Sequence, residues 1–185
     1  MLEPLWTIEP ARGEVINSLA AEGPIYNEDF TQMTVKLRKE CYWSDGVEIT
    51  ADDIVYGVET AMKYQGMGSH ETFNMYIDKV YKTDDYTVVF ELKEPNARFH
   101  ANFLNKWGAW RPFPKHVFEK VEDPLSFDFN PPVSSGPYVL NMILQVTGHF
   151  GKKGKIRIEP QQECCMVNHN QNTYYSITME KKLIK

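Results

Sequence analysis

Apolar and polar residues alternate in two segments of the chain, residues 32–37 and 86–93. A period of two is typical of strands that bury one face, so both segments are predicted strands. The second is preceded by an expected strand over residues 76–83 and by the polar pair Asp84-Asp85. This order predicts a β-hairpin with a short acidic turn.

The pattern changes to a helical period after Thr50. Apolar residues such as Ile54 and Val58 recur four residues apart and define one buried face. Thr50 is a good N-cap, and Asp53 occupies the third position of the first turn, where an acid completes a capping box. A helix is therefore predicted from Thr50 to about Tyr64.

The remaining elements are shorter and less regular. Residues 97–106 and 115–121 are expected to form short helices separated by prolines. A strand is expected to begin at residues 138–140, and residues 155–159 weakly favour another. The mixture of strands and helices, without a repeat, predicts an α+β domain.

Charge divides the chain into two unlike parts. Residues 1–150 contain 22 acidic and 13 basic side chains, whereas residues 151–185 contain three acidic and seven basic ones. An acidic body disfavours nucleic acid as a partner, because phosphate binding needs a basic surface. We expect one segment over residues 1–147 and a basic tail over residues 148–185.

Composition narrows the class of protein further. With 42% hydrophobic and 24% charged residues, the 185-residue chain is of ordinary globular type. Its apolar runs are a few residues long, far short of the ~20 that a membrane helix needs, so an integral membrane protein is not expected. The first residues lack the basic and apolar blocks of a signal peptide.

No catalytic or metal-binding motif is present. The three cysteines and five histidines lack zinc spacing, so no metal and no cofactor are expected. Asp52-Asp53 and Asp84-Asp85 suit general acid–base chemistry, but a helix cap and a hairpin turn explain them more simply. Ser135 lies in a proline-rich loop, where a turn role is favoured over that of a nucleophile. No catalytic residue is predicted.

Several ordered blocks of sequence carry a resemblance. The first group is Val35-Lys-Leu-Arg38, Trp43-Ser-Asp-Gly46 and Thr50-Ala-Asp-Asp-Ile-Val55. The second group is residues 86–95, Pro114-Lys-His-Val117 and residues 132–138. Together they resemble the family 5 extracellular solute-binding proteins of ABC importers, which bind oligopeptides, dipeptides or cello-oligosaccharides. Ser134-Ser135 stand where that family usually has Gly-Thr, and the resemblance ends near Leu140.

The resemblance implies part of the first lobe of a two-lobed, type II periplasmic-binding-protein-like fold. It implies a peptide or oligosaccharide ligand, ABC permease subunits as partners and a periplasmic or extracellular location. Aromatic residues in irregular segments are then the best candidates for ligand contact: Tyr64, Phe73, Trp107 and Trp110. The alternative for each is a place in the core. The Trp43–Gly46 and Thr50–Asp53 motifs are interpreted as determinants of the fold.

Two other functions remain open from the sequence. A chain that matches only part of a larger receptor exposes apolar surface, and such a surface suits a stand-alone or self-associating interaction module. A small hydrolase using Ser135 and a histidine requires those two groups within hydrogen-bond reach.

Overall fold

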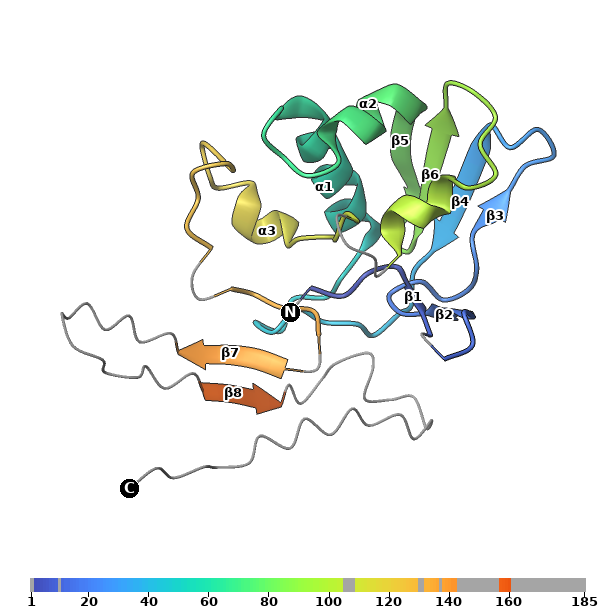
Figure 1. The fold of residues 1–185 in the computed structure, drawn as a ribbon. Coiled ribbons are helices and arrows are strands. Elements are labelled where there is room, and N and C mark those ends of the chain that lie inside the picture. Colours follow the sequence, from blue (N-terminus) through green and yellow to red (C-terminus); the bar gives the residue numbers. More distant parts are fainter. Residues whose placement is uncertain are drawn as a thin grey trace.

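The structure is a computed structural model that describes residues 2–9, 11–104, 109–129, 132–136, 138–142 and 157–160. Within them, helices and short strands mix as the α+β prediction expects (Figure 1). The strands are β1 (Trp6–Ile8), β2 (Val15–Asn17), β3 (Ile25–Tyr26), β4 (Gln32–Lys36), β5 (Ile77–Asp84), β6 (Thr87–Leu92), β7 (Tyr138–Met142) and β8 (Arg157–Pro160). The helices are α1 (Ala51–Lys63), α2 (His70–Tyr76), the 3-10 helix η1 (Phe99–Phe103) and α3 (Lys115–Phe118).

The central sheet has four antiparallel strands in the order β3-β4-β6-β5. The register pairs Val35 of β4 with Val88 of β6, and Met33 with Phe90, so that apolar residues of both strands lie on one face. All four of these residues are fully buried. The predicted strand over residues 32–37 and the predicted hairpin are confirmed, because the alternation that marks them fills this face.

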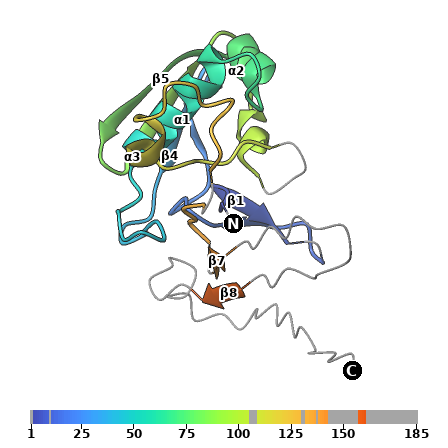
Figure 2. The same cartoon turned by 90° about the vertical axis from the view of Figure 1, so that its left-hand side faces the viewer.

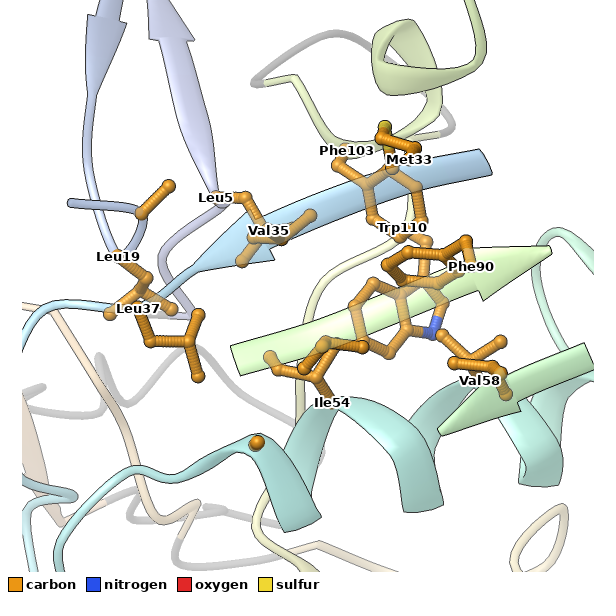
Figure 3. Packing of buried hydrophobic residues seen from close by; sticks show 14 of the residues in the cluster. Leu5, Leu19, Met33, Val35, Leu37, Ile54, Val58, Phe90, Phe103 and Trp110 are labelled. Atoms are coloured by element: carbon orange, nitrogen blue, oxygen red, sulfur yellow. The ribbon is translucent and has the colours of Figure 1, made fainter. Parts of the chain in front are cut away.

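Helix α1 covers the apolar face of the sheet. Its Ile54 and Val58 point toward β4 and β6, and Trp110 lies in the same cluster (Figure 3). The helix begins after Thr50, whose N–H donates to Asp53 Oδ2 at 3.0 Å, and the predicted capping box is present. The prediction of this helix is confirmed at both ends within a residue.

Two of the short predicted helices differ from expectation. Residues 97–106 were expected to be helical. Within residues 97–104, which the structure describes, Phe99–Phe103 form a 3-10 helix, and residues 105 and 106 lie outside the described residues. The expected helix over residues 115–121 ends at Phe118. The four residues of α3 bring Phe118 into contact with Phe113, and their ring centroids lie 4.6 Å apart.

Helix α2 has no counterpart in the sequence-based prediction. It begins after Ser69, which has a left-handed backbone at φ 69°, and it ends where β5 begins. Glycines at positions 66 and 68 precede it. Closely spaced glycines are typical of a loop, so the sequence carries no sign of the seven-residue helix that follows.

Two small antiparallel pairs lie outside the central sheet. Strands β1 and β2 form one pair, and β7 and β8 form the other at the end of the molecule away from α2 (Figures 1 and 2). Strand β8 confirms the weak strand signal at residues 157–159, and residues 155 and 156 lie outside the described residues. Strands β7 and β8 lie on either side of the boundary expected at residue 147 along the chain, and that boundary stays a prediction. No helix in the described part of the chain is both long and apolar enough to cross a membrane.

Candidate functional site

An aromatic layer fills the space between α1, α2 and the segment that leads into α3. It consists of Phe73, Phe103, Trp110 and Phe113, all at most 7% exposed. Phe73 stacks on Phe103 with centroids 5.6 Å apart, and the Trp110 ring meets both edge-on at 6.0 and 5.6 Å. Offset and edge-to-face rings of this kind stabilise a core beyond the area they bury.

Helix α1 makes room for this layer at Gly57. A Cβ atom at this position would lie 2.7 Å from Cζ2 of Trp110, closer than side-chain carbons approach one another. The glycine therefore lets the indole lie directly on the helix backbone. The indole nitrogen of Trp110 is buried there without a hydrogen-bond partner.

Tyr64 lies at the end of α1 and is not part of the aromatic layer. Its N–H donates to the Thr60 carbonyl and closes the last helical turn. Its ring is half-buried, and the Lys63 Nζ atom lies 5.1 Å from the ring centroid. Tyr64 thus presents an aromatic ring and an adjacent positive charge to solvent.

The structure separates the four aromatic residues expected to contact a ligand. It brings Phe73 and Trp110 together in the aromatic layer, with exposures of 0% and 6%. Tyr64 stands at the end of α1 with part of its ring accessible. Trp107 lies outside the described residues. A ligand-binding role for all four stays a prediction.

Polar side chains of α2 attach it to the end of α1 beside Tyr64. The His70 Nδ1 donates to the Ala61 carbonyl at 3.0 Å, and the Asn74 amide donates to the Met62 carbonyl at 2.9 Å. These bonds occupy carbonyls of the last turn, which have no partner within a helix. They fix the orientation of α2 and of Phe73 within it.

Two partly buried charged residues that were not predicted from the sequence, Glu3 and Arg111, interact electrostatically in this region. The Nη1 atom of Arg111 donates to the carbonyls of Leu104 and Ala109 at 3.3 Å each. Burial lowers the pKa of Arg111, and the Glu3 carboxylate opposes that shift. Burial also raises the pKa of Glu3, while a hydrogen bond from Ser18 opposes it. In the sequence, Glu3 and Arg111 are each a single charged residue among apolar neighbours, and this pattern could have marked them as partly buried charges.

The Thr50–Asp53 motif acts on the fold, as interpreted from the sequence. Asp53 is 4% exposed, and its Oδ1 accepts the Lys115 N–H at 2.8 Å, which ties α3 to the start of α1. Asp52 binds the ammonium groups of Lys82 and Lys115. Burial raises the pKa of Asp53, whereas the hydrogen bond from Lys82 lowers the pKa of Asp52.

The Trp43–Gly46 motif also has structural partners. The Ser44 N–H donates to the Ser134 carbonyl at 2.8 Å, and the Ser134 N–H donates to Ser44 Oγ at 2.9 Å. Asp45 binds His116 Nε2 at 2.6 Å. The motif therefore links two segments about 90 residues apart in the sequence.

Ser135, the nucleophile of the hydrolase alternative, is fully buried. Its Oγ accepts the Glu3 N–H at 2.8 Å. The rings of His70, His100 and His116 bond the Ala61 carbonyl, the Tyr26 hydroxyl and Asp45. These contacts favour a structural role for Ser135. Among the described residues, no group of three or more His, Cys, Asp or Glu side chains is placed to hold a metal.

Comparison with known proteins gives a match over most of the chain. Residues 14–146 match the family described as "Bacterial extracellular solute-binding proteins, family 5 Middle". The oligopeptide-binding protein AppA of Bacillus subtilis is 35% identical over 111 residues, which are 56% of this chain and 19% of that protein. The chain spans between 17% and 27% of the length of the curated relatives it matches.

Solved structures agree with this match. AppA of B. subtilis in complex with a nonapeptide has a TM-score of 0.69 and 26% identity, covering 88% of this chain and 31% of that one. A mannohexaose-bound periplasmic oligopeptide-binding protein of Thermotoga maritima has a TM-score of 0.67 and 29% identity, covering 76% and 25%.

The family match, the order of the sequence blocks and the fold agree: the chain belongs to the family 5 bacterial extracellular solute-binding proteins.

Proposed function

We propose that this chain binds a peptide or an oligosaccharide for uptake by an ABC importer. Its partners in this role are the permease subunits of the transporter, and its location is periplasmic or extracellular. The observation that carries the proposal is the family match over residues 14–146.

Two structural neighbours support the choice of ligand class. One is described with a bound nonapeptide and the other with bound mannohexaose, and both are more than 25% identical to this chain. Peptides and sugar chains both offer apolar faces to aromatic side chains and hydrogen-bonding groups to the backbone. The proposed role therefore needs recognition and no covalent chemistry.

Within the proposal, Tyr64 is the first residue assigned to direct ligand contact, because its ring is partly accessible. Phe73 and Trp110 are assigned to the same site from within the aromatic layer. Both rings are buried, so a ligand can touch them only if the aromatic layer opens. While the layer is packed, Phe73 and Trp110 support the neighbouring ligand surface from inside the fold. Trp107 is the fourth proposed contact.

An uptake assay tests this role. Cells of the source organism that lack the gene are expected to lose uptake of a labelled nonapeptide or of labelled mannohexaose, and the wild-type gene is expected to restore it. Tyr64→Ala is expected to restore uptake poorly. Tyr81→Ala, a tyrosine on β5 outside the aromatic layer, serves as the matched control and is expected to restore it fully. Unchanged uptake of both compounds in the deletion strain would contradict the proposal.

One observation favours the alternative of an interaction module. Val15 and Ile16 are consecutive in β2 and 48% and 46% exposed, although neighbouring residues of a strand point to opposite faces. Strand β2 thus exposes apolar side chains on both faces. Self-association would appear as a concentration-dependent mass in analytical ultracentrifugation, and a monomer at all concentrations would exclude it.

A further inference from the structure

The hydroxyl of Tyr26 joins β3 to η1 through two contacts with a single residue. The His100 backbone N–H donates to the Tyr26 oxygen at 3.0 Å, and the same oxygen lies 3.1 Å from His100 Nδ1. Strand β3 stands at the edge of the central sheet and pairs with β4 through two residue pairs. The contact with His100 therefore gives a very short edge strand a second attachment to the fold.

These two contacts indicate where the protons lie. A backbone N–H can only donate, so the Tyr26 oxygen is the acceptor in the first bond. The phenol then directs its own proton to His100 Nδ1, which accepts it with a lone pair. A neutral ring that accepts through Nδ1 carries its proton on Nε2. Burial raises the pKa of Tyr26 above its ordinary value of 10.0, so the phenol keeps its proton at neutral pH.

The surroundings of the His100 ring disfavour a positive charge. The ring is half-buried and meets the fully buried Trp6 of β1 edge-on, with centroids 6.4 Å apart. Trp6 and Tyr26, which face it from β1 and β3, are both uncharged at neutral pH. The charged neighbour in its own segment is the exposed Arg98. Burial lowers the pKa of His100 below its ordinary value of 6.5, and a hydrogen bond to the Ala97 carbonyl opposes that shift.

We propose that the contact between Tyr26 and His100 is an acid-sensitive latch, closed while the ring is neutral and opened when the ring is protonated. A protonated ring carries a hydrogen on both nitrogens, so Nδ1 no longer accepts the Tyr26 proton. The latch is closed above pH 6.5 and opens as the pH falls through the lower folded-state value. In the proposed periplasmic or extracellular location the chain meets the pH of the medium, and the edge strand β3 responds to it.

His70 provides a comparison within the same chain. Its Nδ1 lies 3.0 Å from the Ala61 carbonyl, which can only accept, so this Nδ1 is a donor. Protonation of His70 therefore keeps its bond, whereas protonation of His100 breaks the bond from Tyr26. Nuclear magnetic resonance at about pH 8, where histidine is neutral, is expected to find the proton on Nε2 of His100 and on Nδ1 of His70. A proton on Nδ1 of His100 would overturn the proposal.

Amide hydrogen exchange of the whole chain measures the latch directly, because the His100 N–H donates to the Tyr26 hydroxyl. Its protection factor is expected to fall about two- to tenfold between about pH 8 and about pH 4.5, as one hydrogen-bonded contact is lost. The Ala101 amide, which donates to the Arg98 carbonyl in the same helix, is the internal control and is expected to keep its protection. No fall at His100, or an equal fall at Ala101, would overturn the proposal.

Two variants separate the latch from the other groups that titrate. Tyr26→Phe keeps the ring and removes the acceptor, so the amide of residue 100 is expected to show low protection at both pH values. His100→Gln keeps a side-chain acceptor that does not titrate, so high protection is expected at both. His70→Gln is the control and is expected to retain the fall at His100. A fall that persists in His100→Gln would assign it to another group and would overturn the proposal.

Discussion

Gly57 and Trp110 are in direct contact: the indole lies on the α1 backbone at the one helical position that lacks a side chain. A Cβ atom there would come within 2.7 Å of the ring. This contact seats Trp110 against Phe73 and Phe103 and so connects α1 to the segment before α3. The aromatic layer beside the proposed ligand surface therefore depends on a glycine that no motif marks.

Gly57→Ala is expected to destabilise the chain. Overpacking against Trp110 costs about 1–3 kcal/mol, and the better helix propensity of alanine returns roughly 0.5–1 kcal/mol. A net loss of about 1–2 kcal/mol is expected in urea denaturation. Gly23→Ala is the control, since nothing lies within 4 Å of a Cβ there. Equal or higher stability of Gly57→Ala would contradict the contact.

Asp53 is expected to be a large contributor to stability among the polar side chains. Asp53→Ala leaves the N–H groups of Thr50 and Lys115 without their acceptor and is expected to cost about 2–4 kcal/mol. Asp53→Asn retains one carbonyl oxygen and is expected to cost about half as much. Urea denaturation of both variants measures the difference. A change below about 0.5 kcal/mol in Asp53→Ala would show that α3 is not held through this carboxylate.

Asp52 is expected to stabilise the fold only where it is ionised. The hydrogen bond from Lys82 lowers its pKa below the ordinary value of 3.8. Its contribution is therefore complete above pH 3.8 and is lost as the pH falls through the lower folded-state value. The stability difference between wild type and Asp52→Asn should thus shrink below pH 3.8. High salt should also shrink it at neutral pH, and a difference independent of both would contradict the ion pairs.

The Tyr86 hydroxyl is expected to ionise at a higher pH than an ordinary tyrosine. Its hydroxyl donates to Glu48 Oε1 at 2.7 Å, and this bond raises its pKa from 10.0 to about 12. The bond stabilises the fold below pH 10, and this contribution is lost as the pH rises through 12. The absorbance titration of wild type minus that of Tyr86→Phe isolates this tyrosine. Glu48→Gln should return its pKa toward 10.0, and no change in that variant would rule out the hydrogen bond as the cause.

The sequence predicted the elements whose signals are local. The alternation in residues 32–37 and the cap at Thr50 predicted β4 and the start of α1, because period and capping act within one element. Helix α2 was not predicted, because contacts with other elements stabilise it and its own sequence carries no helix signal. His70 and Asn74 attach it to α1 carbonyls, and a seven-residue helix is marginal without such contacts.

The site was predictable only in part. Aromatic residues near glycines marked Phe73 and Trp110 as notable, but their joint burial depends on contacts between segments far apart in sequence. The bond from Lys115 to Asp53 and the position of Glu3 near Arg111 also arise from tertiary structure. No local pattern reports such distances, so the sequence indicated the residue types and the fold was needed to place them.

Calorimetric titration of the intact chain with a nonapeptide and with mannohexaose tests the proposed solute binding directly. We expect saturable binding of one molecule per chain for at least one of these ligands, weakened in Tyr64→Ala and unchanged in Tyr81→Ala. The absence of saturable binding for both compound classes at millimolar concentration would contradict it.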